Sequence, residues 1–297
     1  MKEITAIIPV GSDRKLDICE SLKQYKNEVK FIVIVGPNPS ENRNKGIKKA
    51  KTELVAFLNA HSILTEDWLD NIKKFFKKYP EIDVVGGPQF TNKSDPMFER
   101  ASGYALSSIF GAADVSIRYK SSRLNLNASE TDLTSANLIC KKRVLNKIKF
   151  DENLWPGEDP KFISEAKKAG FKVAYSPDIA VYNKRRKNSA ELAKQIFNYG
   201  FTRTRKESIN ETIKKPFFLI PSLFVIYLLM VPTLLLLNSL SLIPIIIYLI
   251  LIVFFSFYET IKNNDIKPIF LIPYIFLIIH FSYGIGFLFG LISKRKR

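Results

Sequence analysis

The segment LVAFLNAH, residues 54–61, decides the fold of this chain of 297 residues. Five apolar residues, Leu54–Leu58, form a run with the length of a buried strand, and the polar residues Asn59 and His61 follow closely. A buried strand that ends in a polar loop is typical of sheets that bind a ligand at the ends of their strands. We therefore expect a strand at Leu54–Leu58 and a functional loop after it.

Similar apolar runs lie on both sides of this segment, and helical segments separate them. We expect strands at Ile4–Pro9, Val29–Val35 and Ile82–Val85, and helices at Leu16–Tyr25, Glu41–Lys51 and Glu66–Lys78. Strands that alternate with helices predict an α/β fold, Rossmann-like, with a mostly parallel sheet and helices on both faces. Because ligands of such sheets bind at the carboxyl ends of the strands, the loops after Pro9, Val35 and Leu58 are candidate sites.

Asn59 and His61 are candidate ligands of a divalent metal that carries a diphosphate. The chain has two histidines, and one of them lies in this loop. An imidazole nitrogen and an amide oxygen are both ordinary metal ligands. A single loop histidine has other common roles, so a loop without a metal is the alternative interpretation.

A second candidate site is Trp155-Pro156-Gly157-Glu158-Asp159-Pro160, which precedes an expected helix at Lys161–Ala169. Helix starts favour acidic residues for capping and for the helix dipole, so a structural role is one interpretation. The functional interpretation is a general base, in which one carboxylate takes a proton from an attacking hydroxyl. The local sequence leaves both interpretations open.

Charge and cysteine content restrict the partners and the compartment. The formal net charge is +17, which suits anionic lipid headgroups and ligands that carry phosphate. Nucleic acid is the other common partner of a basic chain, but no nucleic-acid-binding motif is present, and an apolar C-terminal region favours membrane phosphate. The two cysteines, Cys19 and Cys140, form no disulfide framework or zinc spacing, which fits a reducing, cytoplasmic compartment for the first part of the chain.

The C-terminal region, residues 216–297, predicts an integral membrane protein, because three stretches without a charged residue occupy it: 217–237, 239–258 and 269–292. Each has about 20 residues, enough to cross a ~30 Å hydrocarbon core. With a cytoplasmic first part, three crossings would place the basic end, Lys294–Arg297, outside, against the positive-inside rule. The last stretch could instead re-enter or lie flat, with a break at its glycines, or Gly286 and Gly290 could form a close helix contact.

Residues 188–215, which precede these stretches, have the pattern of a basic amphipathic helix or a pair of helices. Asn188 and Glu191 have the spacing of a capping box. Such a segment suits the headgroup layer of a membrane, and an ordinary surface helix is the alternative. We expect an α/β domain at 1–187, this interfacial segment at 188–215, and a membrane region at 216–297.

The order of these motifs resembles the family 2 inverting glycosyltransferases, in particular the branch with membrane tails that builds exported or lipid-linked glycans in bacteria and archaea. The similarity covers most of the chain, and although each motif is loose, their order and spacing are specific. The motifs are Ile7-Ile8-Pro9, Arg43-Asn44-Lys45-Gly46, Phe57-Leu58-Asn59-Ala60-His61, Phe150-Asp151-Glu152, Gly157-Glu158-Asp159 and residues 195–200, followed by the apolar stretches.

The resemblance implies a GT-A fold and an enzyme that uses a nucleotide-sugar donor. It implies that Asp159, with Glu158 beside it, is the catalytic base, and that Asn59 and His61 occupy the family's Asp-x-Asp positions, which bind Mg²⁺ or Mn²⁺. It places the donor against Pro9, Val10, Asn38, Arg43, Asn44, Lys45, Asn59 and Ala60. It places the acceptor and a closing segment at Asn137, Lys142, Arg143, Gln195, Tyr199 and Arg203, with plain surface solvation as the alternative for Lys142 and Arg143.

The chain departs from the family's pattern at two places. Gly36-Pro37-Asn38 stands where many members carry an aspartate that reads the nucleobase, and Asn59-Ala60-His61 lacks both carboxylates of Asp-x-Asp. Arg43 and Lys45 could hold the phosphates in place of a metal. The leading hypothesis is transfer, with inversion, from a UDP- or GDP-sugar to a polyprenyl-phosphate or polyprenyl-diphosphate-glycan acceptor at the cytoplasmic face. A degenerate transferase that only binds a glycolipid or a partner enzyme is the alternative.

Overall fold

The computed structural model describes residues 4–12, 22–207 and 209–294, and the chain divides into two compact units. The sheet unit comprises Met1–Asn92 and Asp114–Lys184, and the helical unit comprises Lys93–Ala113 and Arg185–Arg297. The chain therefore leaves the sheet unit after Asn92, contributes residues 93–113 to the helical unit, and returns. The expected helix at Leu16–Tyr25 lies partly outside the described residues, and Cys19 lies wholly outside them.

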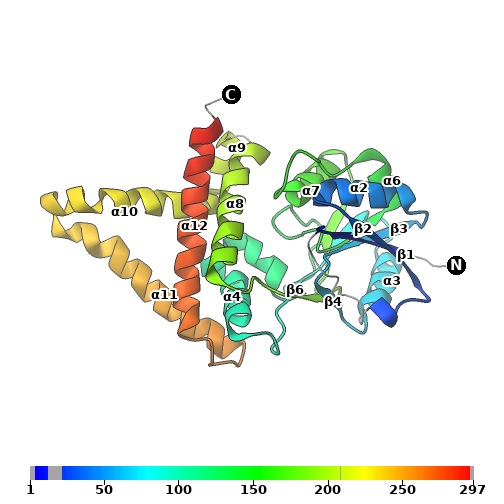
Figure 1. The fold of residues 1–297 in the computed structure, drawn as a ribbon, viewed down its shortest axis with the longest axis horizontal. Helices are drawn as coiled ribbons and strands as arrows, with labels where there is room; N and C mark the ends of the chain where they lie inside the picture. The colour runs from blue at the N-terminus through cyan, green and yellow to red at the C-terminus, as the bar shows by residue number, and fades with distance from the viewer. Residues whose placement is uncertain (1–3, 13–21, 208, 295–297) are drawn as a thin grey trace. The chain divides into compact units, whose positions relative to one another are not determined.

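The sheet unit alternates strands and helices as expected (Figure 1). Its strands are β1 (Ile4–Val10), β2 (Val29–Val35), β3 (Leu54–Leu58), β4 (Ser62–Leu64), β5 (Val84–Gly86), β6 (Gln89–Phe90), β7 (Asn137–Lys141), β8 (Val173–Tyr175) and β9 (Val181–Asn183). Its helices are α2 (Pro39–Lys49), α3 (Trp68–Lys78), α6 (Lys142–Lys147) and α7 (Glu158–Lys168), and the 3-10 helix η1 (Ala113–Tyr119) enters it from the helical unit. Apolar runs predicted β2 and β3 to the residue, although β3 is almost fully buried whereas β2 has exposed residues between its buried ones.

The main sheet has the strand order β2-β1-β3-β7-β5-β8 in the described part of the chain. β1 pairs in parallel with β2 and β3, and β5 pairs in parallel with β8. β7 runs antiparallel to both of its neighbours, β3 and β5, so the sheet is mixed. The α/β architecture is confirmed, and β7 is the feature that the alternation of strands and helices did not reveal.

Two apolar layers enclose this sheet, one on each face. Ile4, Ala6 and Ile8 of β1 pack in a cluster with Trp68 and Ile72 of α3. On the other face, the neighbouring residue of the strand, Ile7, packs in a cluster with residues of α2, α6 and α7, which include Ile47, Val144, Leu145, Phe162 and Ile163. Alternate residues of a strand point to opposite faces, so helices cover both sides, as the sequence predicted.

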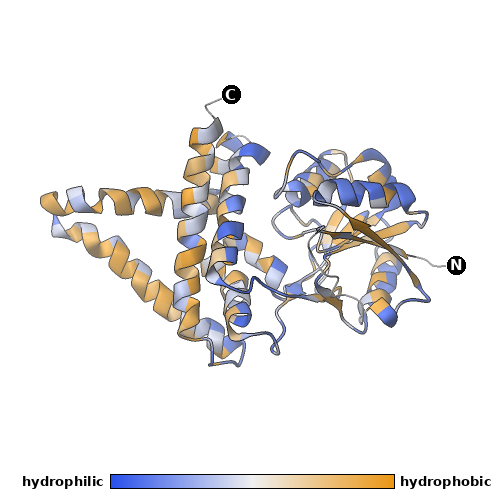
Figure 2. Cartoon of the chain, viewed as in Figure 1, coloured by the Kyte–Doolittle hydropathy of each residue, from blue (hydrophilic) through white to orange (hydrophobic). Residues whose placement is uncertain are grey.

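The helical unit contains α4 (Met97–Ser107), α5 (Ile109–Ala112), α8 (Ser189–Lys206), α9 (Ile209–Ile213), η2 (Pro216–Phe218), α10 (Ile220–Leu237), η3 (Ser239–Leu242), α11 (Ile243–Lys262) and α12 (Leu271–Lys294). Three helical segments are long and apolar enough to cross a membrane: Ile220–Leu237, Ser239–Lys262 and Leu271–Ser293. Figure 2 shows that apolar residues dominate them. The predicted apolar helices are confirmed, but α12 is one continuous helix, so no break occurs at its glycines.

The capping box at the start of α8 is confirmed. Asn188 is the N-cap, its Oδ1 accepts a hydrogen bond from the Glu191 backbone N–H at 2.9 Å, and its Nδ2 donates to Glu191 Oε1 at 3.2 Å. The first bond is that of a capping box, and the second joins the two side chains in place of the usual bond to the N-cap backbone N–H; together they hold the first turn of α8.

Candidate functional site

The loops after β1, β2 and β3 share one edge of the main sheet. The register pairs Val10 with Val35 and Ile7 with Phe57, so the carboxyl ends of these parallel strands lie side by side. The Asn42 Nδ2 donates to the Gly36 carbonyl at 2.9 Å and to the Val10 carbonyl at 3.5 Å, which ties α2 to this edge. Sequence reasoning missed Asn42, although it belongs to the same polar run as Arg43 and Asn44.

The loop after β2 starts α2 by a side-chain cap. Asn38 Oδ1 accepts hydrogen bonds from the backbone N–H groups of Ser40 at 3.0 Å and Glu41 at 3.3 Å, and its Nδ2 donates to the Glu152 carbonyl at 2.8 Å. Asn38, which was expected at the donor, therefore lies at this edge of the sheet, where its side chain caps α2.

The centre of the candidate site is an ion pair between α2 and α7. Arg43 Nη1 lies 2.8 Å from Glu158 Oε1 and 3.9 Å from Asp159 Oδ1. Arg43 and Glu158 are both 4% exposed, so water screens their attraction poorly. The Arg43 guanidinium also lies over the Phe150 ring, 5.2 Å from its centroid. Arg43 is far in the sequence from the adjacent residues Glu158 and Asp159, and the fold brings the three together in one cluster around a buried ion pair.

The two carboxylates of this cluster have different surroundings. Burial and the neighbouring Asp159 raise the pKa of Glu158, and the Arg43 guanidinium opposes that rise. Asp159 is more open, with a side chain 19% exposed, although its Oδ1 is buried beside Arg43 and makes no hydrogen bond within the described residues. Glu158 is therefore an anchored carboxylate, while part of the Asp159 side chain stays open to solvent.

Gly157 sets the direction of these carboxylates, because it is the N-cap of α7 in the left-handed region, with φ of +116°. We expect Gly157→Ala to cost about 1–2 kcal/mol of folding free energy, the strain of a Cβ in that region, and to lower transfer by displacing Glu158 and Asp159. Thermal unfolding and initial rates of transfer measure the two effects.

The matched control is Gly170→Ala. Gly170 has φ of +85°, and an added Cβ would meet nothing within 4 Å. This change should lower stability by a similar amount but leave transfer unchanged, because Gly170 follows the other end of α7. Equal losses of transfer in both variants would show that Gly157 does not position the carboxylates.

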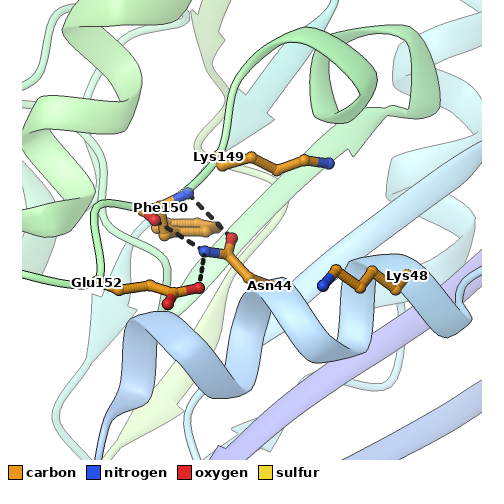
Figure 3. Close-up of a pocket in the computed structure, with 5 residues that line it drawn as sticks. All are labelled: Asn44, Lys48, Lys149, Phe150 and Glu152. Atoms are coloured by element: carbon orange, nitrogen blue, oxygen red, sulfur yellow. Dashed lines mark hydrogen bonds between the residues drawn. The ribbon is translucent and has the colours of Figure 1, made fainter.

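Asn44 links α2 to the segment before α7. Its Nδ2 donates to the Phe150 carbonyl at 2.8 Å and to Glu152 Oε1 at 2.9 Å, and its Oδ1 accepts from the Phe150 N–H at 3.1 Å (Figure 3). With Lys48, Lys149, Phe150 and Glu152 it lines an open pocket of about 330 Å³. Burial, and then repulsion by Lys142 and Lys48, lower the pKa of Lys149. These bonds occupy both ends of the Asn44 amide, so Asn44 holds the segment of Phe150 and Glu152 against α2.

Lys45, the third residue of this motif, lies on the surface. Its Nζ is 2.6 Å from Glu41 Oε1, and the two side chains are 54% and 40% exposed. An exposed pair one helical turn apart is an ordinary surface contact. Of the two cations expected at the donor phosphates, Arg43 alone joins the buried cluster.

Asn59, Ala60 and His61 follow β3 at the same edge of the sheet as Val10. Ala60 is buried, whereas Asn59 and His61 are partly exposed, and the Ser62 N–H donates to the Asn59 carbonyl at 3.1 Å. No group of three or more His, Cys, Asp or Glu side chains that could hold a metal ion occurs among the described residues. Asn59 and His61 could thus supply two ligands at most, and a bound diphosphate would have to supply the others.

Asn137 does not have the free side chain expected of an acceptor residue. It is 1% exposed, its Nδ2 donates to the Ile179 carbonyl at 2.7 Å, and its Oδ1 accepts from the Trp68 indole N–H at 3.2 Å. Both ends of the amide are therefore occupied by bonds that hold β7 in the core, and its expected role is replaced by a structural one.

Lys142 and Arg143 lie at the edge of the sheet opposite to the loops after β1, β2 and β3. β7 runs antiparallel to β3, with Asn137 opposite Leu58 and Lys141 opposite Leu54, so the chain beyond Lys141 lies at the amino ends of β1 and β3. There Lys142 donates to the Ile47 and Ala50 carbonyls at the end of α2, and Arg143 pairs with Asp83. The direction of β7 therefore places both cations away from the loops after β1, β2 and β3, and their role at an acceptor stays a prediction.

Gln195, Tyr199 and Arg203, the expected closing segment, all lie on α8 in the helical unit. Gln195 Nε2 donates to the Tyr199 hydroxyl at 2.7 Å, and Gln195 Oε1 accepts from Arg186 Nε at 3.2 Å. Arg203 is buried, 3.2 Å from Glu207, with its guanidinium 3.3 Å from the Phe218 ring centroid. Inside this unit Arg203 therefore joins α8 to the start of the apolar helices.

Comparison with known proteins shows the family of this chain. The profile of the family described as glycosyltransferase like family 2 matches residues 2–201. The chain is 26% identical over 221 residues to the minor teichoic acid biosynthesis protein GgaB of Bacillus subtilis (strain 168). That match covers 70% of this chain but 23% of GgaB, so the chain spans about a quarter of that relative.

Two solved structures match the chain at low identity. The mannosyltransferase PcManGT from Pyrobaculum calidifontis, in complex with GDP-Man and Mn²⁺, has a TM-score of 0.60 at 11% identity, over 98% of this chain and 88% of that one. TarS 1-349 of S. aureus, in complex with UDP-GlcNAc, matches at 15% identity over 99% of this chain and 92% of that one, with a TM-score of 0.45. The first of these likenesses shows the GT-A fold for this chain.

Proposed function

Because this chain belongs to the glycosyltransferase like family 2 and is a GT-A glycosyltransferase homologue, we propose that it transfers a sugar from a nucleotide-sugar donor to a lipid-linked acceptor with inversion. The observation that carries the proposal is the buried cluster of Arg43, Glu158 and Asp159 beside the carboxyl edge of the sheet. Asp159 is the general base of the proposed reaction, and Glu158 and Arg43 hold it in place.

The proposed reaction is a single displacement. The acceptor hydroxyl loses its proton to Asp159, and its oxygen attacks the anomeric carbon from the side opposite the leaving group. The bond from that carbon to the nucleoside diphosphate breaks, the diphosphate leaves with the bonding electrons, and the configuration inverts. A base is needed when the acceptor is a sugar hydroxyl, whereas an ionised phosphate oxygen needs none. The mechanism therefore favours a glycan on a lipid diphosphate.

The lipid-linked acceptor is supported by the apolar helices and by the charge. Three helical segments long and apolar enough to enter a membrane follow the sheet unit in the same chain, and the net charge of +17 suits phosphate-bearing ligands. The relative GgaB is a minor teichoic acid biosynthesis protein, which favours an anionic cell-envelope glycan as the acceptor. We place the sheet unit on the cytoplasmic side, where nucleotide sugars are made.

The test is a screen of UDP- and GDP-sugars with the full-length protein in detergent or membranes. Labelled sugar should enter the lipid extract from one donor, and the product should have the anomeric configuration opposite to that of the donor. Binding of a donor without transfer or hydrolysis in any combination would instead support a degenerate transferase, which the loss of both Asp-x-Asp carboxylates motivates.

A divalent cation would supply charge neutralisation for the leaving diphosphate, with His61 and the Asn59 amide as its protein ligands. Two such ligands bind Mg²⁺ or Mn²⁺ weakly, because both ions prefer several oxygen ligands. We therefore expect Mn²⁺ to bind the protein tightly only when UDP or GDP is present. The Kd for Mn²⁺ should be at least about tenfold lower with the nucleotide than without it. Isothermal titration with and without the nucleotide measures this.

Two variants test whether Asn59 and His61 themselves bind Mn²⁺, as distinct from Mn²⁺ binding to the nucleotide alone. Asn59→Asp adds a carboxylate at the first ligand position and should lower the Mn²⁺ concentration that gives half-maximal binding. His61→Ala should raise it. Unchanged Mn²⁺ binding in both variants would remove this loop as the metal site and leave Arg43 as the partner of the phosphates.

A further inference from the structure

The three apolar helices of the helical unit differ in how much protein covers them. In α10 and in the segment of η3 and α11, 11% of the most apolar window is buried, whereas in α12 it is 44%. Figure 1 shows α12 running beside α8, while α10 and α11 extend away from both and meet at their far ends. Only lipid can cover helices that are apolar on all sides, so α10 and α11 enter the bilayer.

Glycines bring α12 and α8 into backbone contact over a shared length. A Cβ on Gly286 would lie 2.2 Å from the Phe197 carbonyl, one on Gly290 2.7 Å from the Phe201 carbonyl, and one on Gly200 2.2 Å from the Tyr283 carbonyl. The predicted small-residue contact is thus confirmed, and its partner is α8. The two helices therefore lie at the same depth along this length.

α8 cannot be inside the hydrocarbon core. It has 18 residues, and its charged side chains lie toward its two ends: Glu191 and Lys194 near the start, and Arg203, Arg205 and Lys206 in the last turn. The uncharged stretch between them, residues 195–202, is about 12 Å long, too short to cross a ~30 Å core without taking charges into it. Each charge near the bilayer centre costs at least about 2.5 kcal/mol. Because α8 must stay in the headgroup layer, the second half of α12 stays there with it.

The first half of α12 is held at the surface by α4 and α5. His280 Nε2 donates to the Phe110 carbonyl at 2.8 Å, and the loop between α11 and α12 is fixed through Asp265, which is 3.1 Å from Arg100 and 2.9 Å from the Tyr104 hydroxyl. α4 and α5 come from residues 93–113, between two segments of the sheet unit. α4 has 11 residues, about 16 Å, so this excursion is too short to cross a ~30 Å core and return.

The free face of α12 is an apolar stripe. Tyr274, Ile285, Phe289 and Ile292 are 48%, 47%, 55% and 63% exposed, and the half-buried Ile278 and Phe281 lie on the same face between the first two. The opposite face, which includes Ile275, Phe276, Ile279 and Phe287, is buried. A helix that is covered by a charged helix on one side and apolar on the other suits the boundary between headgroups and acyl chains.

We propose that α12 lies along the membrane surface with this stripe against the acyl chains of one leaflet, and that only the hairpin of α10 and α11 enters the bilayer. The charges agree: Lys214 and Lys215 precede the hairpin, Lys262 and Lys267 follow it, and its tip, residues 238–242, has no charge. The basic end of the chain then lies on the same side as α8, which removes the conflict with the positive-inside rule. The inference stands independently of the proposed transfer reaction.

Depth-dependent quenching tests the position of α12. In a Cys19→Ser background, in which Cys140 is fully buried, a bimane label is attached to the full-length protein at Tyr274→Cys, Ile285→Cys or Ile292→Cys. Leu229→Cys, 76% exposed in α10, is the reference. The protein is reconstituted in phosphatidylcholine and phosphatidylglycerol vesicles with bromine at shallow or deep acyl carbons.

All three labels on α12 should report the same shallow depth, and Leu229→Cys a deeper one. If α12 crosses the bilayer, Ile285→Cys, near the middle of the helix, reports a much greater depth than Tyr274→Cys and Ile292→Cys, and the proposal is overturned.

A second measurement needs no label in the helix. In sealed membrane vesicles, tags at the two ends of the chain should be digested by protease together, and digestion of one without the other would equally overturn the proposal.

Discussion

Asp159→Asn should reduce transfer to a sugar hydroxyl by at least about 10²-fold, the usual contribution of a general base. The amide has nearly the same shape but cannot take the proton, and Glu158 cannot replace it because Arg43 holds Glu158 at 2.8 Å. Donor binding should be unchanged, since the carboxylate acts on the acceptor. Initial rates with the full-length protein, together with the Kd for the donor, measure the effect.

The control for this change is Asp70→Asn, on the exposed side of α3. It removes one negative charge without touching the cluster, so transfer should stay within about twofold of the wild type. Retained transfer in Asp159→Asn, with a folded protein, would exclude Asp159 as the base. If the acceptor is an ionised lipid phosphate, the variant should keep most of its activity, so the same experiment also reports the class of acceptor.

Arg43→Met should be the most destabilising single change at the site, by about 3–5 kcal/mol at pH 8. Methionine fills much of the volume, but Glu158 then has to stay buried as an unpaired anion or become protonated. The loss should therefore depend on pH. Burial already raises the pKa of Glu158, and removal of Arg43 raises it further. The variant should therefore keep its full stability below the pKa that Glu158 has in the unfolded chain. It should lose stability as the pH rises through the higher pKa that Glu158 has in the folded protein.

Two further variants make this prediction specific. Glu158→Gln added to Arg43→Met removes the buried charge and should restore part of the stability at pH 8, but not the transfer. Lys45→Met breaks an exposed pair on the same helix and should cost less than about 1 kcal/mol. Thermal and denaturant unfolding of the full-length protein at pH 5.5 and 8 compare them. An equal loss in Arg43→Met at both pH values would show that the pair contributes packing and not charge compensation.

Much of the architecture could be predicted because its signals are local. Continuous apolar runs mark β2 and β3 as strands, of which β3 is buried on both faces, and the absence of charge over about 20 residues marks the apolar helices. The start of α8 follows from two residues three apart, Asn188 and Glu191, which bond within one turn. Each of these features depends on neighbours in the chain, so the sequence displays it directly.

The candidate site could be predicted only in part. The motif around residues 43–45 suggests three donor residues, yet Asn44 is occupied by Phe150 and Glu152, and Lys45 by Glu41. Lys142 and Arg143 were expected beside the acceptor, but they follow a strand whose direction cannot be read from its apolar pattern. An apolar run has the same composition in either direction, so periodicity does not distinguish parallel from antiparallel pairing.

By itself, the sequence determined the α/β alternation, the apolar helices and the identity of the acidic pair, because each is set by the types and spacing of nearby residues. Three features depend on the tertiary structure. Arg43 bonds to Glu158, 115 residues away in the chain, and the antiparallel direction of β7 places Lys142 and Arg143 at the amino ends of β1 and β3. The third is the close packing of α12 against α8. These contacts join segments far apart in the sequence. Their geometry depends on how the whole chain packs, and no local pattern of residues contains it.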